Sequence, residues 1–147
     1  ARDLFSRALA ADPNDVRVLV HLANLSLREK DTSAAKTWAE KALKADPRAA
    51  SAWSALGAAQ VQLGEEQGAL ESWSRAIAED PAQYDSLFNL AVLNGRMGRV
   101  EEARQALERF LASAPADRYR ARRAEAKALL AGLRRPRSDG SGPASRR

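Results

Sequence analysis

Four prolines, at positions 13, 47, 81 and 115, are separated by intervals of 34 residues each. The 147-residue chain contains only six prolines, so most of them obey this one spacing. A fixed period of about 20 to 50 residues is typical of solenoids, in which each repeated unit buries its apolar face against its neighbours. The period therefore predicts an extended array and directs the search for function to a surface.

Alignment on the prolines defines three complete units, 16–49, 50–83 and 84–117, preceded by residues 1–15 as the second helix of a truncated unit. Apolar residues recur in columns, of which the fourth position holds Leu19, Trp53 and Leu87 and the seventh holds Leu22, Leu56 and Leu90. Small residues follow at the eighth position, and a second apolar stripe runs through the latter half of each unit. Apolar spacings of i, i+3, i+4 and i+7 predict two helices per unit, so we expect an all-α fold of antiparallel helix pairs.

Glycine, aspartate and proline mark the expected helix boundaries. Gly64 and Gly98, at position 15 of their units, suit the left-handed residue that ends a helix. Lys30 takes that place in the first unit, where Asp31 is an alternative source of the turn. The Asp-Pro pairs at 12–13, 46–47 and 80–81 are expected to bring a carboxylate near a helix N-terminus and to place the proline early in the helix.

These columns resemble the tetratricopeptide repeat, in which Trp, Leu, Gly and Tyr are followed by Ala, Phe, Ala and Pro. The resemblance is carried by Trp53-Ser54-Ala55-Leu56-Gly57 and Leu87-Phe88-Asn89-Leu90-Ala91 and covers residues 1–133. Position 11, usually Tyr in the family, departs from the pattern and holds Ser26, Gln60 and Asn94, which removes a packing aromatic. The resemblance implies a right-handed α-solenoid whose first helix in each pair lines a concave groove.

In the family, positions 2, 5, 6, 9, 12 and 13 of each unit face that groove. The implied groove residues are Arg17, Val20, His21, Asn24, Leu27 and Arg28, then Ser51, Ser54, Ala55, Ala58, Val61 and Gln62, then Asp85, Phe88, Asn89, Val92, Gly95 and Arg96. The small Ala55 and Ala58 leave room for an incoming chain, and an amide such as Asn24 suits hydrogen bonding to an extended backbone. This surface favours an extended peptide or a helix as ligand; the alternative is that these residues merely suit a helix on an unused face.

Some members of the family hold the carboxylates of chaperone tails with Lys at position 5 and Asn at position 9 of one unit, Asn at position 6 of the next, and Lys at position 2 and Arg at position 6 of the third. The corresponding residues here are Val20, Asn24, Ala55, Asp85 and Asn89. Only Asn24 fits, and Asp85 has the wrong sign for an anionic ligand. Capture of a chaperone tail is therefore not expected.

Catalytic chemistry finds little support in the sequence. His21 is the single histidine, cysteine is absent, and no nucleophile or phosphate-loop motif occurs. The acidic pairs at 65–66 and 101–102 are expected to complement the dipoles of second helices. Trp53 and Trp73 fall in core columns, whereas Trp38 is expected to be half exposed. We therefore predict a chain that is not an enzyme and needs neither metal nor cofactor.

Basic charge is concentrated near the end of the sequence. Residues 1–116 carry 14 Lys and Arg against 16 Asp and Glu, a net charge of −2, whereas residues 117–147 carry 10 against 3, a net charge of +7. We expect a capping helix over 118–133 with apolar positions at Ala121, Ala124, Ala128 and Leu129, then a disordered basic tail over 134–147. A nucleic-acid partner is not favoured, because aromatic residues hardly interleave with the arginines.

The favoured function is a non-catalytic scaffold that binds a protein or peptide in its groove. One alternative is an accessory segment, with an upstream domain, of a larger bacterial enzyme such as a sulfatase or glycosyltransferase, since the chain starts in mid-repeat and is rich in Ala and Arg. Another is homo-oligomer formation through Leu4, Phe5 and Leu9, for which the pattern supplies no partner helix. No apolar run is long enough to span a membrane and no signal peptide is visible, so a cytoplasmic location is the default expectation.

Overall fold

The computed structural model describes residues 2–134, which form eight helices and no strand. In chain order these are α1 (Arg2–Ala11), α2 (Val16–Arg28), α3 (Thr32–Ala45), α4 (Ala50–Gln62), α5 (Glu66–Glu79), α6 (Tyr84–Arg96), α7 (Val100–Ser113) and α8 (Arg120–Arg134). Within that range no helix has the length and apolar character that a membrane span requires. The tail expected over 134–147 lies, apart from Arg134, outside the described residues.

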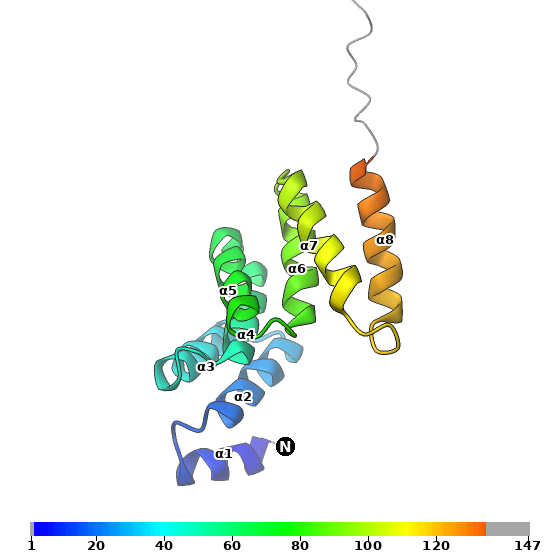
Figure 1. The fold of residues 1–147 in the computed structure, drawn as a ribbon. Helices are drawn as coiled ribbons and strands as arrows, with labels where there is room; N and C mark the ends of the chain where they lie inside the picture. The colour runs from blue at the N-terminus through cyan, green and yellow to red at the C-terminus, as the bar shows by residue number, and fades with distance from the viewer. Residues whose placement is uncertain (1, 135–147) are drawn as a thin grey trace, which may run out of the picture.

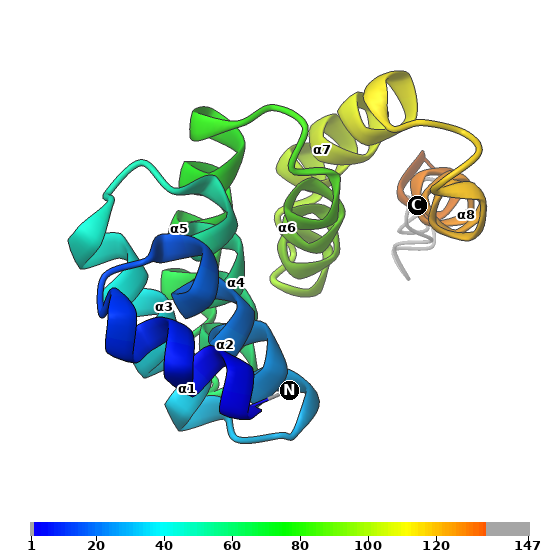
Figure 2. The same cartoon turned by 90° about the horizontal axis from the view of Figure 1, so that it is seen from below.

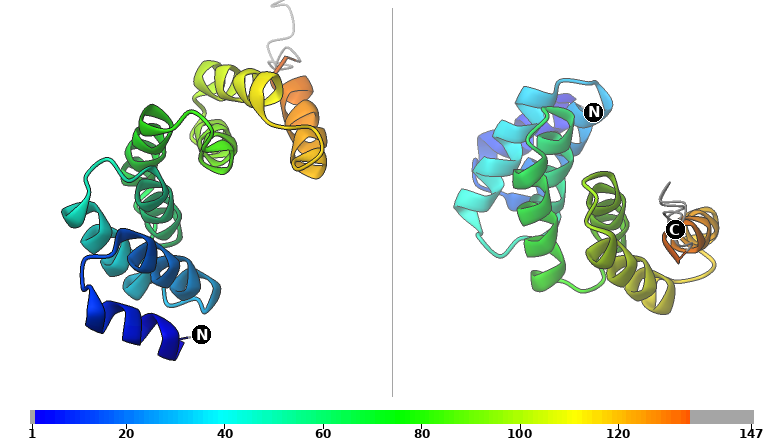
Figure 3. Two further views of the ribbon diagram at one scale, coloured as in Figure 1. Left: turned by 60° about the horizontal axis from the view of Figure 1, so that its bottom comes forward. Right: turned by 90° about the horizontal axis from the view of Figure 1, so that it is seen from above.

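Consecutive helices run antiparallel and stack side by side along a curved array (Figure 1). Figure 3 shows the stack from two further sides, with α1 and α8 at its opposite ends. Buried apolar residues form several clusters along the stack: one around Leu19 and Ala42, a second around Ala39 and Leu56, a third around Trp73 and Leu93, and a fourth around Leu87 and Phe110. The predicted all-α solenoid of helix pairs is confirmed, and each pair buries its apolar face against its neighbours.

Each junction between units is an Asp-Pro turn that closes before the next helix begins. The carboxylates of Asp12, Asp46 and Asp80 accept hydrogen bonds from the backbone N–H two residues later, at 3.0, 3.0 and 2.9 Å. Their carbonyl oxygens accept from the N–H three residues later, which makes a β-turn with proline at its second position. The expectation that the prolines lie early in the helices was wrong: α2, α4 and α6 each begin three residues after the proline.

A left-handed residue ends the first helix of each pair. Gly64 and Gly98 have φ angles of 80° and 75°, as their positions predicted, and Lys30 adopts φ of 62° in the same column. The N–H of the following residue reaches the carbonyl five residues back in all three units, at 2.8 to 2.9 Å. Asp31 does not supply the turn; its carboxylate caps α3 by accepting a hydrogen bond from the Ala34 N–H at 3.2 Å.

Within the second helix pair, Trp73 of α5 packs directly against the backbone of α4. Trp73 is 3% exposed and lies over Gly57, and its indole N–H donates to the Ser54 carbonyl oxygen at 3.2 Å. Trp73 is thus a core residue, as predicted. Trp53 is only half-buried, with its indole N–H donating to the Pro47 carbonyl oxygen at 2.9 Å in the preceding turn.

The last helix packs with a different face from the one the sequence indicated. The four residues named as the apolar positions of this helix are all exposed: Ala121, Ala124, Ala128 and Leu129. Ala126 and Leu130 are buried against the end of the array instead, together with the half-buried Tyr119. The Tyr119 ring lies 5.9 Å from the ring of Phe110 in an edge-on contact. Burial of this aromatic ring outweighs burial of alanine methyl groups and selects the face that α8 presents.

A polar contact also keeps α8 in the orientation that buries Ala126 and Leu130. The guanidinium of Arg123 donates to the carbonyl oxygens of Leu111 and Ala114, at 2.7 and 2.9 Å. These oxygens belong to the C-terminal end of α7, where the last carbonyls of a helix have no partner within the helix. A cation at this end also complements the helix dipole. Arg123 therefore caps one helix while it orients the next.

Lys30 offers a direct test of the left-handed turns. We expect Lys30→Gly to raise the free energy of unfolding by about 0.5–1 kcal/mol, because the strain of a left-handed lysine exceeds the extra chain entropy of glycine. Urea denaturation measures the difference. The reverse change, Gly64→Lys, should lower the free energy of unfolding by a similar amount, since nothing lies within 4 Å of an added Cβ there. Equal stability in all three proteins would contradict this account.

Gly57 tests the contact beneath Trp73. An added Cβ would lie 2.5 Å from the indole nitrogen, so we expect Gly57→Ala to lower the free energy of unfolding by about 1–3 kcal/mol. Gly132 in α8 is a matched control, because a Cβ there meets no atom within 4 Å. Gly132→Ala should raise helix stability by up to about 1 kcal/mol. An unchanged thermal midpoint for Gly57→Ala would show that the ring moves aside without cost.

Candidate functional site

The predicted groove face of α2 is polar and reachable. Arg17, His21, Asn24 and Arg28 recur at helical spacing along one side of the helix, and all four are exposed. The His21 ring stacks on that of Phe5 from α1, with 5.6 Å between ring centroids. Among the described residues, Asn24 and Arg28 have no hydrogen-bond or ion-pair partner in their side chains. This face is therefore open to a polar ligand.

The middle of the groove face, on α4, carries small side chains. Ala55 is 3% exposed and packs with the cluster around Ala23, so it supports the surface rather than forming it. Ala58 is half-buried beside it. Ser54 is half-buried as well, and its hydroxyl oxygen accepts a hydrogen bond from the hydroxyl of Ser86 at 2.8 Å, which joins α4 to α6.

The third part of the groove face, on α6, is partly covered by α8. Phe88 is 6% exposed, with its ring 5.4 Å from that of Phe110 and 5.3 Å from the guanidinium of Arg122. Arg122 also pairs with Asp85 at 2.6 Å. Asn89 is half-buried and its amide has no hydrogen-bond partner within residues 2–134. Asn89 is thus the free polar group of α6 on this side.

Two further groove residues take part in the junctions between units. Gln62 at the end of α4 accepts a hydrogen bond from the hydroxyl of Thr32 at 3.0 Å. Arg96, at the same position of α6, pairs with Glu66. Each contact joins the start of a second helix to the end of the next unit's first helix. These side chains therefore have structural partners already.

Burial separates the predicted groove residues into two groups. Three of them are at most 9% exposed: Val20, Ala55 and Phe88. The others named for the groove are half-buried or exposed: Arg17, His21, Asn24, Leu27, Arg28, Ser51, Ser54, Ala58, Val61, Gln62, Asp85, Asn89, Val92, Gly95 and Arg96. Helical periodicity identified a shared side of each helix, but it could not show which residues a neighbouring helix covers.

The first helix offers less apolar surface than the sequence indicated. Leu4 is 71% exposed. Phe5, however, stacks on His21, and Leu9 is half-buried against the cluster around Leu19. Of the three residues for which no partner was expected, two have one. A single exposed leucine is ordinary on a protein surface.

A second surface, which the groove analysis did not identify, lies between α5 and α7. Here α6 passes between the two helices (Figure 2) and forms the floor of a hollow of about 440 Å³. The apolar lining residues are Leu70, Ile77, Leu87, Leu90 and Ala106, and the polar ones are Ser74, Asn94, Arg99, Glu102, Gln105 and Arg109. Leu87, Leu90 and Asn94 occupy positions 4, 7 and 11, on the opposite side of α6 from the groove residues. The third unit has neither of the family's aromatic residues at positions 4 and 11, which here hold Leu87 and Asn94.

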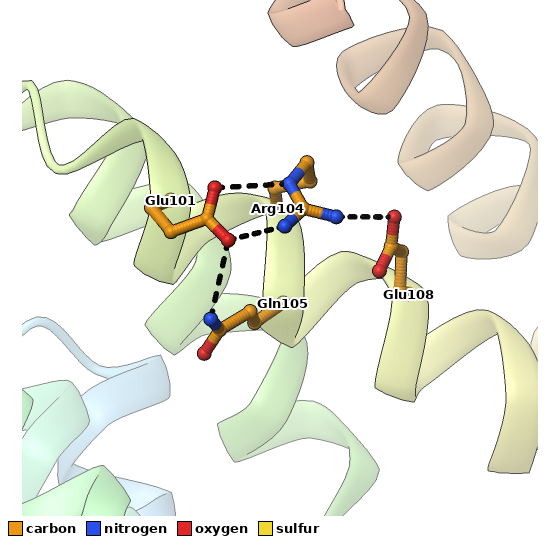
Figure 4. A network of polar contacts seen from close by, with 4 residues as sticks. All are labelled: Glu101, Arg104, Gln105 and Glu108. Atoms are coloured by element: carbon orange, nitrogen blue, oxygen red, sulfur yellow. Dashed lines mark hydrogen bonds and ion pairs between the residues drawn. The ribbon is translucent and has the colours of Figure 1, made fainter.

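One rim of the hollow is ordered by a polar network on α7 (Figure 4). Arg104 pairs with Glu101 and donates to Glu108 at 2.9 Å, and Gln105 donates to Glu101 at 3.2 Å. Hydrogen bonds from Arg104 and Gln105 hold the pKa of Glu101 below its ordinary value, and the bond from Arg104 has the larger effect. Gln105 is thereby fixed at the rim. The side chains of Glu102 and Arg109, which line the same hollow, have no hydrogen-bond or ion-pair partner among residues 2–134.

Comparisons with known proteins agree on one family. Two family profiles described as tetratricopeptide repeat match residues 1–59 and 54–118. Tetratricopeptide repeat protein 8 of Caenorhabditis elegans is 37% identical over 59 residues, which make up 40% of this chain and 12% of that protein. Superkiller protein 3 of Schizosaccharomyces pombe is 33% identical over 91 residues, 62% of this chain and 7% of that protein. The chain thus spans only a small fraction of either relative.

Solved structures share the fold over most of the chain. A crystal structure of MamA has a TM-score of 0.69 at 25% identity, covering 88% of this chain and 82% of MamA. YrrB, described as a TPR protein with an unusual peptide-binding site, has a TM-score of 0.77 at 20% identity, covering 88% of this chain and 63% of YrrB. The secretion chaperone SycD of Yersinia enterocolitica, in complex with a peptide of the translocator YopD, reaches 0.73 at 18% identity, covering 78% and 88%.

The α7 network generates a prediction about protonation. We expect the pKa of Glu101, followed by carboxyl NMR during a pH titration, to lie below that of an isolated glutamate and to rise in Arg104→Gln. Because the folded-state pKa is lowered, the stabilisation from this network is present above the unfolded pKa and is lost as the pH falls through the folded pKa. Gln105→Ala should produce a smaller rise. A larger rise in Gln105→Ala than in Arg104→Gln would contradict the assignment of the main partner.

Proposed function

The chain belongs to the tetratricopeptide-repeat family, and from that premise we propose that it is a non-catalytic scaffold that binds an extended peptide or a helix of another protein on its groove face. The observation that carries the proposal is the pair of unpartnered amides, Asn24 on α2 and Asn89 on α6. A carboxamide can donate to and accept from a peptide backbone at the same time. Unused amides on two units suit a ligand that runs across the array.

The surface between the two amides supports the same proposal. Ala58 on α4 is small and half-buried, and it leaves space above the middle unit. The half-buried Val92 on α6 adds apolar contact beside Asn89. Two proteins of the same fold are described as peptide-binding or peptide-bound, YrrB and SycD. An extended segment could therefore make backbone hydrogen bonds at both sides and place a larger side chain over the centre.

The test is a double variant that removes both amides. Peptides selected from a random library against the 147-residue chain would be measured by calorimetry against Asn24→Ala/Asn89→Ala. We expect a loss of about 1–3 kcal/mol in binding free energy, the value of two net hydrogen bonds. Phe88 is left unchanged, because it is buried against Phe110 and its removal would disturb the fold.

Asn14→Ala is the matched control for this experiment. Asn14 is exposed in the turn before α2, and its backbone N–H, rather than its side chain, donates to the Asp12 carboxylate. The control should bind the selected peptides as tightly as the unchanged chain does. If the double variant also keeps full affinity, the groove face is not the peptide site.

A further inference from the structure

The second and third units have different residues at position 4 of the repeat. Trp53, at position 4 of the second unit, joins a cluster with Trp38 and Leu43 of α3. A surface depression beside Trp53 is lined by residues of α4 and α5 and by none of α3. The indole therefore lines this depression from α4 and packs, with residues of α3, against one apolar cluster. At the same position of the third unit stands Leu87, and the hollow there extends from α7 across to Leu70 and Ile77 of α5.

An arginine accompanies the ring in the second unit. The guanidinium of Arg75, at position 26, lies 5.8 Å from the centroid of the Trp53 ring. Position 26 of the third unit is Arg109, which lines the hollow. Arg109 is exposed, and its guanidinium has no partner among the described residues. The third unit thus repeats the cation that covers an aromatic ring, but it lacks the ring.

We propose that the hollow between α5 and α7 binds an aromatic side chain presented by a partner protein. Its apolar floor, which includes Leu90 and Ala106, matches the flat faces of an aromatic ring. Its volume, about 440 Å³, falls within the range of ligand pockets. Arg109 covers the inserted ring from the rim, as Arg75 covers Trp53. The inserted ring stands to Arg109 as the Trp53 indole stands to Arg75.

Asn94 supplies a polar group suited to the same ligand. It is 6% exposed at the edge of the hollow, and its amide nitrogen donates to the Leu90 carbonyl oxygen at 3.0 Å. The amide oxygen receives no donor from residues 2–134. An indole N–H or a phenol O–H can donate to it. The preferred anchor is therefore a tryptophan or a tyrosine rather than an aliphatic residue.

This surface is separate from the proposed peptide groove. The hollow is lined from α6 by residues at positions 4, 7 and 11, whereas the groove face carries positions 2, 6 and 9 on the other side of the same helix. A partner anchored in the hollow leaves Asn24 and Asn89 free. Either proposal can consequently fail without the other.

N-acetyl-tryptophanamide is the probe for the test, titrated into the 147-residue chain and followed by two-dimensional NMR. We expect saturable shifts centred on Leu70, Leu90 and Ala106, and weaker binding of N-acetyl-leucinamide. Arg109→Ala should weaken binding of the tryptophan probe by about 2- to 5-fold, the value of an exposed cation–π contact. Arg109 is exposed and unpartnered, so its replacement leaves the fold intact.

Arg75→Ala is the matched control, because Arg75 covers a ring that belongs to the chain itself. It should bind the probe as the unchanged chain does. The proposal is overturned if the probe causes no shifts at the hollow up to its solubility limit, or if the shifts centre on Asn24 and Asn89 instead. Equal effects of Arg109→Ala and Arg75→Ala would overturn it as well.

Discussion

Close contact between helices at small side chains is the constraint on which the rest of this array depends. Alanines in the second helices are fully or almost fully buried, as at Ala35, Ala69 and Ala103. An alanine contributes little apolar area, so its role is to let two helix axes approach until larger side chains interlock. Gly57 is the extreme case, because it brings the Trp73 indole against the α4 backbone. Burial is thereby divided among neighbouring pairs, and no single central core forms.

The C-terminal end of the array shows how the solenoid stops. Tyr119 packs on Phe110, and Arg123 binds the free carbonyl groups at the end of α7. Arg122, one residue earlier, pairs with Asp85 and lies over the Phe88 ring. The short segment from Tyr119 into the first turn of α8 therefore caps a helix, completes an apolar cluster and covers the last part of the groove face. A ligand on that face meets α2 and α4 more openly than α6.

The two proposed surfaces arise from different properties of the same helices. Groove residues such as Asn24 and Asn89 face away from the apolar stripe, so their identity is not restricted by packing. The α5–α7 hollow arises from the stripe itself, where Leu87 and Asn94 stand at positions at which the family pattern has aromatic residues. A departure from the repeat pattern that leaves the fold intact thus accompanies a hollow between α5 and α7. Variation at packing positions can create a binding site as readily as variation on the face of the helix.

By itself, the sequence determined the period, the helix pairs, the glycine turns and the columns of large and small residues. Each of these depends on local preference or on the 3.6-residue period, and both can be recognised in a linear pattern. Only the tertiary structure decided that Val20, Ala55 and Phe88 are buried. It also decided that Lys30 takes a left-handed turn and that α8 exposes the alanines of its apolar stripe. Periodicity shows which residues share a side of a helix, but the contacts of a neighbour, such as Phe110 with Tyr119, determine which side is covered.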